Sequence, residues 1–356
     1  MKKDDRSKVE YIDRGEAENP KVEREVKLRK AKTRKVMRFL DRLFGFMLAT
    51  VLVIGVAGLG LVYVLERGPS EALTTLFVST MQETRRFDFM ANIFLTENEV
   101  SAMRASQQED TVKEFNSSLI NIASADSPNA AASTDYPEDE DGDGIIFEEI
   151  SSSGYTGYLI TVLDPTRVFL GMPDTYGGAG LTLENMVKKY DALGGINAGG
   201  FPDDGGSGSG GKPVGLTICD GVCYGDSNGE SVFVGYFDEW SAGVNNIQFG
   251  ASFGPVLIMN GEAVDPAALP SGVNPRTAIG QRADGAVMML VIDGRQVHSM
   301  GATYADCMNI MLDHGAVNAI NMDGGSSTSM YYNGAYVNKS SAKTGPRELP
   351  TAFLFK

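Results

Sequence analysis

The stretch that decides the fold is Ala316-Val-Asn-Ala-Ile-Asn-Met-Asp-Gly-Gly-Ser-Ser-Thr-Ser329. Apolar and polar residues alternate over Val317–Met322, which predicts a short β-strand. Asp323 follows that strand, and the chain then turns through Gly324, Gly325, Ser326 and Ser327. Glycines allow backbone N–H groups to face an anion, and serine hydroxyls add donors beside the same carboxylate. The stretch is therefore either a polar turn after a core strand or a carboxylate beside an anion-binding loop.

The first 65 residues predict a membrane anchor. Residues 1–42 hold 15 Lys+Arg and 9 Asp+Glu with few apolar side chains, which is typical of a disordered basic tail. Residues 43–65 carry no charge. A helix of that length spans about 34 Å, enough to cross a hydrocarbon core of roughly 30 Å and longer than a signal-peptide core. Because basic residues crowd its N-terminal flank, we expect a single-pass protein with a cytoplasmic N-terminus and an extracellular C-terminal domain.

The rest of the chain is acidic. It carries a net charge of −21, because the whole chain carries −15 and residues 1–42 carry +6. So negative a module is not expected to bind nucleic acid or anionic lipid non-specifically. Helical periodicity begins at Pro69, and a Ser-, Ala- and Asp-rich linker follows it. We therefore divide the chain into a basic tail, a transmembrane helix, a helical lead-in with an acidic linker, and a main domain, at residues 1–42, 43–65, 66–144 and 145–356.

The main domain is rich in strand and hairpin signals. Asn260-Gly261 and Asp284-Gly285 are typical of hairpin turns, and residues 286–292 form a strongly apolar strand pattern. Helices are expected after the N-caps Thr182 and Thr303. Hairpins outnumber regular strand–helix–strand units, so we predict an α+β fold with mixed, hairpin-rich β-sheets and packed helices.

One acidic loop has the start of a calcium motif. Asp139, Asp141, Asp143 and Gly144 match the first positions of an EF-hand loop. The twelfth position, where a bidentate Glu belongs, is Ile150, and a strand pattern follows instead of a helix. An incidental acidic turn is therefore favoured over a weak calcium site, and no other cofactor is expected.

Two cysteines flank a hairpin signal. Cys219 and Cys223 enclose Asp-Gly-Val, so they either form a disulfide that closes a very small loop or remain reduced thiols. The distance between their Cα atoms distinguishes these alternatives.

Two arginines stand in short polar strings, Arg276 within Asn274–Gly280 and Arg295 within Asp293–Arg295. Basic residues are scarce beyond the membrane span, and a guanidinium forks onto phosphate oxygens. Either arginine could instead pair with one of the many acidic groups, and Asp293-Gly294 could be only another hairpin turn.

Four strings occur in order along the main domain: Gly195–Phe201, Asn274–Gly280, Asp293–Arg295 and Asn321–Thr328. Together they resemble the phosphodiester glycosidase family, whose bacterial members are often linked to exopolysaccharide biosynthesis. The resemblance covers about residues 145–356. Ala198 departs from it, because the family usually has glycine directly after the asparagine. The resemblance implies hydrolysis of a sugar-1-phosphodiester at the anomeric carbon, which frees the sugar and leaves a phosphomonoester.

Roles follow from the resemblance and the chemistry together. Asp323 and Asp293 are the candidate catalytic carboxylates, and Asp323 is the better placed. A phosphomonoester, with a second pKa near 6, leaves readily, so charge stabilisation matters more than general-acid help. The candidate substrate- or phosphate-binding residues are Asn197, Arg276, Thr277, Arg295, Gly324, Gly325, Ser326 and Ser327. Cleavage at phosphorus by two metals is disfavoured, because His298 and His314 have no ligand spacing.

A second function of another class remains open. The domain could bind cell-envelope polysaccharide without turnover, as an adaptor beside an export or assembly machine. In either case we expect a glycan or sugar-1-phosphodiester partner, attachment to the membrane through one helix, and no nucleic acid.

Overall fold

The computed structural model describes residues 20–83, 87–105, 116–120, 137–202, 210–225, 232–237 and 247–356. The chain divides into two compact units, one that ends at Leu61 and one that runs from Val62 to Lys356. Part of the predicted basic tail and most of the predicted linker lie outside the described residues.

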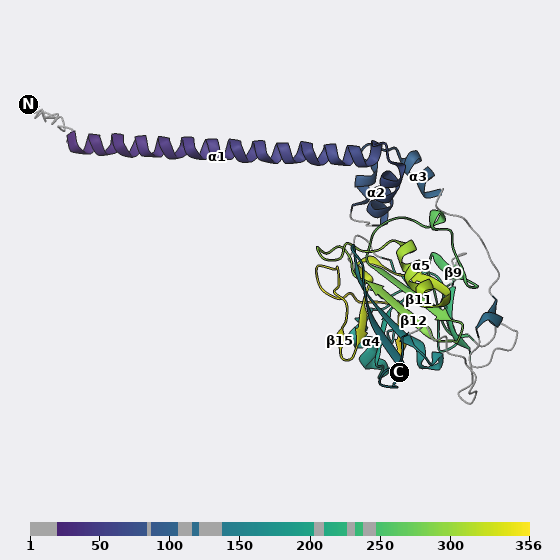
Figure 1. Ribbon diagram of the computed structural model, residues 1–356. Helices are drawn as coiled ribbons and strands as arrows, with labels where there is room; N and C mark the ends of the chain where they lie inside the picture. Colours follow the sequence, from purple (N-terminus) through teal and green to yellow (C-terminus); the bar gives the residue numbers. More distant parts are fainter. Residues whose placement is uncertain are drawn as a thin grey trace, which may run out of the picture. The chain divides into compact units, whose positions relative to one another are not determined.

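Helix α1 runs from Pro20 to Arg67 and contains the predicted transmembrane residues (Figure 1). Among the described residues, its portion Lys32–Arg67 is the one helix long and apolar enough to be a candidate membrane span. Apolar side chains such as Phe44 and Leu52 are exposed along it. That exposure fits a helix whose apolar surface contacts lipid.

The predicted helical lead-in is present as α2 (Glu71–Glu83), a 3₁₀ turn η1 (Asp88–Asn92) and α3 (Glu97–Ala105). A small apolar cluster joins them through Val78, Ala91, Leu95 and Val100. The N-terminus of α3 has a reciprocal cap, in which the Thr96 hydroxyl accepts from Glu99 N and the Glu99 carboxylate accepts from Thr96 N. The lead-in therefore has its own core.

The described residues of the main domain form three sheets. The seven-stranded sheet has the order β1 (Ile145–Ser151), β2 (Thr156–Val162), β12 (Val287–Ile292), β11 (Arg276–Arg282), β13 (Ala316–Met322), β9 (Val256–Met259) and β10 (Glu262–Ala263). The five-stranded sheet has the order β15 (Ala335–Tyr336), β14 (Met330–Tyr332), β4 (Gly194–Asn197), β16 (Ala352–Phe355) and β3 (Val168–Gly171). The four-stranded sheet has the order β6 (Val222–Tyr224), β5 (Thr217–Cys219), β8 (Ile247–Ser252) and β7 (Val232–Phe237).

The two larger sheets pack face to face, and a helix covers the outer side of each. Alternate residues of β12 divide between two cores: Val287, Met289 and Val291 face the five-stranded sheet, whereas Met288, Leu290 and Ile292 face α5 (Tyr304–Asp313). On the other side α4 (Leu183–Tyr190) packs on β16 through Leu183 and Met186. The order of layers is therefore helix, sheet, sheet, helix, which explains why β12 is apolar on both faces.

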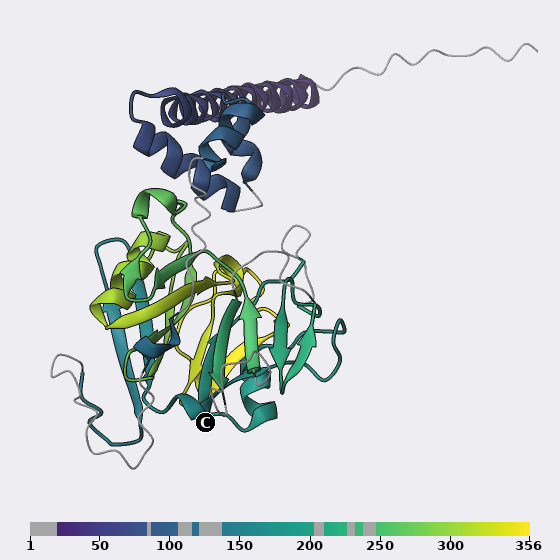
Figure 2. The ribbon, with the colours of Figure 1, turned by 90° about the vertical axis from the view of Figure 1, so that its right-hand side faces the viewer.

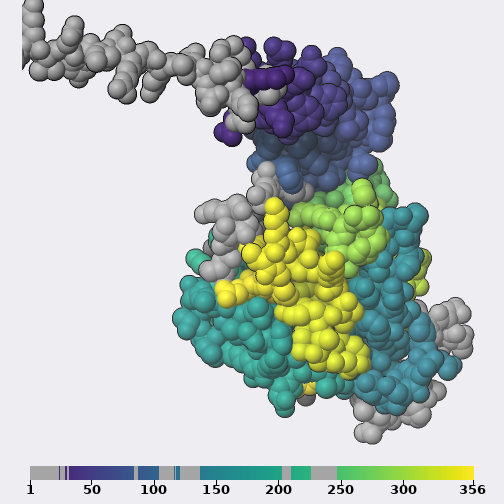
Figure 3. Space-filling model, turned by 90° about the vertical axis from the view of Figure 1, so that its left-hand side faces the viewer, coloured from purple at the N-terminus to yellow at the C-terminus, as the bar shows by residue number. Residues whose placement is uncertain are grey.

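The predicted α+β class is confirmed, with hairpin-rich sheets and packed helices (Figure 2). Every described strand pair is antiparallel, so the strand directions are more uniform than the mixed sheets that the sequence predicted. Asn260-Gly261 closes the β9–β10 hairpin with both residues at positive φ, as its sequence predicts. In the space-filling view the C-terminal residues, in yellow, form a continuous area of one face (Figure 3).

The disulfide considered for Cys219 and Cys223 is absent, and both thiols are free. Asp220-Gly221 forms a two-residue turn that pairs Cys219 with Val222, so Cys223 lies one position past the partner. Successive side chains of a strand point to opposite faces, which leaves Cys219 buried and Cys223 exposed. Burial raises the pKa of the Cys219 thiol to about 11, and its Sγ donates to the Leu170 carbonyl at 3.2 Å.

Candidate functional site

Three of the four sequence motifs meet where the central strands β11, β12 and β13 of the seven-stranded sheet begin or end. The register pairs Arg276 with Ile292 and Thr277 with Met322. Asp293 follows Ile292 at the end of β12, and Asp323 follows Met322 at the end of β13, so both lie beside the start of β11. Antiparallel pairing of β11 with both β12 and β13 thus brings residues of three strands together.

The motifs pack so closely there that only glycine fits at two positions. A Cβ added at Gly324 would lie 2.8 Å from the Pro275 carbonyl oxygen, and one at Gly294 would lie 2.6 Å from Pro275 N. Gly325 has φ +62° and its N–H donates to the same carbonyl at 2.9 Å. The glycines of the Asp-Gly-Arg and Asp-Gly-Gly-Ser strings therefore serve the mutual approach of three loops around Pro275.

Asn197 brings the remaining motif to this edge from the five-stranded sheet. It is 1% exposed, and its Nδ2 donates to the Asp323 carbonyl at 2.6 Å. Its Oδ1 accepts from Thr277 Oγ1 at 2.8 Å and from Ser329 N at 3.0 Å. These bonds make Asn197 and Thr277 positioning residues for the Asp323 loop, and contact of either residue with a substrate stays a prediction. Ala198, which stands where the family usually has glycine, packs in the core between the sheets. Its carbonyl accepts from Asp323 N at 3.0 Å.

The turn after Asp323 presents both backbone and hydroxyl groups. Asp323, Gly324, Gly325 and Ser326 are partly exposed, whereas Ser327 is buried. Two of the N–H groups expected to face an anion are used inside the protein, since Gly325 N donates to Pro275 O and Ser327 N donates to Gly324 O. Side chains therefore supply part of the polar surface around Gly325 and Ser326, including those of two arginines.

Arg295 and Arg347 approach this turn from two different loops. A Cβ at Gly325 would lie 3.4 Å from Arg295 Nη2, and Arg347 Nη1 donates to Ser326 Oγ at 3.2 Å. The Arg347 guanidinium also stacks on the Phe201 ring at 4.7 Å, which fixes its plane. Burial lowers the pKa of Arg295, and the nearby charge of Arg276 lowers it further. The turn that follows Asp323 is thus flanked by two guanidinium groups.

Arg276 has a different environment from the other two. It is 3% exposed, its Nε donates to the Ala302 carbonyl at 3.0 Å, and its guanidinium lies 3.7 Å from the centre of the Tyr304 ring. Nη2 forms an ion pair at 2.7 Å with Glu83 of α2 and donates to the Gly272 carbonyl. Burial opposes its charge, but Tyr304 and Glu83 raise the pKa of Arg276 above its ordinary value. The predicted phosphate ligand is therefore a charged, buried group that already has a protein carboxylate as partner.

Asp293 is turned into the protein. It is 3% exposed, and its Oδ1 accepts from Asn338 Nδ2 at 3.2 Å and from Lys339 N at 3.1 Å. Its carbonyl accepts from Ser299 Oγ at 2.6 Å. Burial raises the pKa of Asp293, although the hydrogen bonds from Asn338 and Lys339 oppose the shift. A catalytic role for Asp293 stays a prediction, and its visible role is to fasten the segment after β15 to the β12 edge.

That raised pKa gives a testable pH dependence. The folded state holds the Asp293 proton more tightly than the unfolded state. The protonated group therefore stabilises the fold fully at pH values below the pKa of Asp293 in the unfolded chain, about 3.9. This stabilisation is lost as the pH rises through the higher pKa of Asp293 in the folded state. Asp293→Asn removes this loss. We expect the melting temperature of the variant, relative to wild type, to be more favourable at pH 7 than at pH 3.5. Thermal melts at both values check this, and a relative stability that falls with rising pH would contradict it.

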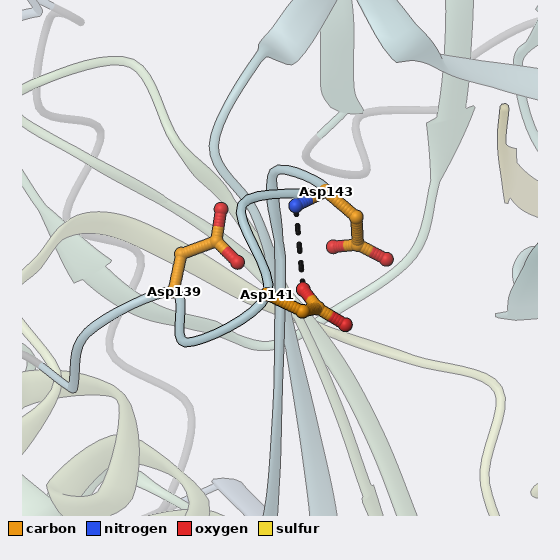
Figure 4. Close-up of side chains that lie close together, drawn as sticks. All are labelled: Asp139, Asp141 and Asp143. Atoms are coloured by element: carbon orange, nitrogen blue, oxygen red, sulfur yellow. Dashed lines mark hydrogen bonds between the residues drawn. The ribbon is translucent and has the colours of Figure 1, made fainter.

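The acidic loop Asp139–Asp143 has a compact arrangement of carboxylates (Figure 4). One ligand oxygen from each of Asp139, Asp141 and Asp143 lies within 4.8 Å of the others. Each carboxylate already accepts a backbone N–H of the loop: Asp139 from Gly142 and Gly144, Asp141 from Asp143, and Asp143 from Ile145. Ile150, at the position where an EF-hand has glutamate, lies on β1. The hydrogen bonds explain the shape of the loop, and calcium binding stays an expectation from the sequence.

The structure brings two further residues, Arg347 and Glu83, to the site. Arg347 lies in the C-terminal tail with only its scarcity as a signal, and Glu83 lies in the lead-in helix, which carries no family motif. Both act through side-chain contacts across the fold, so no local pattern predicts them.

Comparison with known proteins agrees with the motif analysis. Residues 190–356 match the family model "Phosphodiester glycosidase". A SPbeta prophage-derived uncharacterized protein of Bacillus subtilis (strain 168), YomE, is 30% identical over 198 residues, which cover 49% of this chain and 29% of that protein. The chain thus corresponds to less than a third of the length of this curated relative. The zebrafish N-acetylglucosamine-1-phosphodiester alpha-N-acetylglucosaminidase catalytic domain, auto-inhibited by its pro-peptide, is 23% identical with a TM-score of 0.48, over 59% of this chain and 81% of that one.

The matched residues contain all four strings and every residue assigned to the candidate site except Glu83 and the weak calcium ligands. The resemblance that the strings predicted is therefore confirmed: residues 190–356 match the phosphodiester glycosidase family model.

Proposed function

We propose that the chain is a membrane-anchored hydrolase that cleaves the bond between an anomeric carbon and phosphate in a sugar-1-phosphodiester of the cell envelope or of an exopolysaccharide. One observation carries the proposal: Asp323 immediately precedes a turn that the guanidinium groups of Arg295 and Arg347 both approach. The reacting carbon of such a substrate needs a carboxylate, and its neighbouring phosphate needs fixed positive charge.

These positions support the following reaction. The bond from the anomeric carbon to the phosphate oxygen breaks with its electron pair on that oxygen, and water adds to the carbon. Asp323 either takes the proton from the water or attacks the carbon first and is then released by water. Arg295 and Arg347 neutralise the charge that grows on the departing phosphate. Because the leaving phosphomonoester is stable as an anion, protonation of the leaving oxygen contributes little.

Isotopic water distinguishes this reaction from attack at phosphorus. The full chain in detergent micelles is incubated with a chromogenic sugar-1-phosphodiester in ¹⁸O-labelled water, and the products are weighed by mass spectrometry. We expect the label on the sugar and none on the phosphomonoester. Label on phosphate would contradict the proposal, and saturable binding without turnover would favour the adaptor role.

The arginines give a sharper test of the substrate class. Arg347→Ala removes a charge-assisted contact to phosphate that is worth roughly 1.5–3 kcal/mol, so kcat/KM for the phosphodiester should fall about 10- to 100-fold. An aryl glycoside of the same sugar has no phosphate, and its kcat/KM should not change. Lys188→Ala is the matched control, because Lys188 is exposed and pairs with Glu184 on α4. Equal losses on both substrates would show that Arg347 supports the fold and does not bind phosphate.

We also propose that α1 crosses the membrane and holds the hydrolase outside the cell. The uncharged stretch and the basic residues on its N-terminal side support this orientation. Protease added to intact protoplasts should remove the C-terminal domain, and complete protection would contradict the orientation.

A further inference from the structure

Lead-in helix α2 reaches the candidate site with a single carboxylate. Figures 1 and 2 both show α2 beside the green loop that precedes β11. The contact is specific: Thr80 Oγ1 accepts from Val273 N at 3.1 Å, and Glu83 Oε2 accepts from Arg276 Nη2 at 2.7 Å and from Asn274 Nδ2 at 2.9 Å. Glu83 and Asn274 are 191 positions apart, so this contact belongs to the tertiary fold.

Arg276 needs the carboxylate as a counter-charge. Its side chain is 4% exposed, and a buried guanidinium without a partner loses hydration that carbonyl oxygens alone do not replace. Glu83 is 21% exposed and forms an ion pair with this arginine. We therefore take Glu83 as a permanent structural partner that balances the charge of Arg276.

The same carboxylate sets the direction of the Asn274 amide. Asn274 is 3% exposed, donates from Nδ2 to Glu83, and accepts at Oδ1 from Arg295 Nη2 at 2.9 Å. An amide placed between a carboxylate and a guanidinium has one favourable orientation, because reversal would set its oxygen against Glu83 and its NH₂ against Arg295. Glu83 thus fixes, through Asn274, the acceptor that holds one nitrogen of Arg295.

We propose that Glu83 is a positioning residue of the phosphate-binding site, which the membrane-proximal helix completes from outside the matched family domain. The proposal rests on the proposed function, because Arg295 is taken to bind the substrate phosphate. It deepens that function, since α2 lies outside residues 190–356 and also outside the predicted main domain 145–356.

The test compares three variants of the full chain in detergent micelles. Glu83→Ala removes both hydrogen bonds, whereas Glu83→Gln keeps an oxygen that accepts from Arg276 and Asn274. Glu71→Gln, on the exposed first turn of the same helix, is the matched control. Calorimetric titration with inorganic phosphate gives Kd, and turnover of the sugar-1-phosphodiester gives KM and kcat.

We expect Glu83→Ala to raise Kd and KM at least about tenfold, because the alignment of one charge-assisted contact is lost, with kcat changed less than KM. Glu83→Gln should lie between wild type and Glu83→Ala, because it keeps the acceptor for Asn274 but loses the counter-charge of Arg276, and Glu71→Gln should not differ. If Glu83→Ala does not fold, Gly272→Ala replaces it, since a Cβ there would lie 2.6 Å from Glu83 Oε1 and displace the carboxylate while keeping every charge.

Unchanged or tighter phosphate binding by Glu83→Ala or Gly272→Ala would overturn the proposal, and tighter binding would identify Glu83 as an anion that competes with the ligand. The two hypotheses fail separately. A wild-type chain that binds phosphate but turns over no phosphodiester removes the proposed activity, while the Kd comparison still judges Glu83. A wild-type chain that neither binds nor turns over removes both.

Discussion

Replacing Asp323 by asparagine is expected to lower kcat for a sugar-1-phosphodiester by about 10²- to 10⁴-fold, with KM close to the wild-type value. Asparagine has nearly the same shape but neither takes a proton from water nor attacks the anomeric carbon. The backbone N–H and carbonyl of residue 323, which bond to Ala198 and Asn197, are unchanged by the substitution. The loop should therefore keep its position while the chemistry fails.

Steady-state kinetics on the full chain measures this effect, with a thermal melt to confirm folding. Asp313→Asn is the control, because Asp313 is an exposed aspartate at the end of α5. Asp293→Asn should be milder, since its buried carboxylate bonds to Asn338 and Lys339. Near-normal turnover by folded Asp323→Asn together with an inactive Asp293→Asn would reverse the roles of the two carboxylates.

Local patterns predicted most elements of the fold. The expected strands over 317–322 and 286–292 are β13 and β12, and the helix expected after the Thr303 cap is α5. These segments are predictable because periodicity, capping and turn residues all agree within each one. The uniform antiparallel pairing and the order of the layers are not, since they depend on which distant strands meet.

The hairpin at Asp220-Gly221 shows how far side-chain contacts can be predicted from sequence. Asp220-Gly221 was identified correctly as a turn, but its two-residue form pairs Cys219 with Val222 and sends Cys223 to the other face. One residue of register separates a disulfide from two free thiols. The sequence contains the turn, and only the backbone shows the register.

In the candidate site, too, the motifs could be predicted from the sequence and the contacts between side chains could not. The four strings were predictable as a set because each holds glycine or polar residues at positions where the loops approach one another. The partners of those residues were not predictable. Arg276 pairs with Glu83, one of the two alternatives left open, and its contact with phosphate stays a prediction; Arg347 reaches Ser326 from the tail. Composition marks a scarce arginine, but packing selects its partner.

Asn197→Ala is expected to be the most destabilising single change at the site. It would leave three groups, Ser329 N, Thr277 Oγ1 and the Asp323 carbonyl, without the amide that now satisfies them at 3.0, 2.8 and 2.6 Å. An unsatisfied buried group costs about 1–3 kcal/mol, and neighbours are not additive, so we expect a loss of about 3 kcal/mol. For a unit of this size that lowers the melting temperature by roughly 5–10 °C.

The same substitution separates positioning from substrate contact. If Asn197 acts through the Asp323 loop, the variant should lose kcat and thermal stability together, because a loosened loop no longer holds the carboxylate. If Asn197 only contacted substrate, KM would rise without a change in melting temperature. Asn185→Ala, on the exposed face of α4, is the control for loss of an amide. Melts and kinetics of the two variants decide, and a folded Asn197→Ala with wild-type stability would show that the carboxylate is held by the backbone alone.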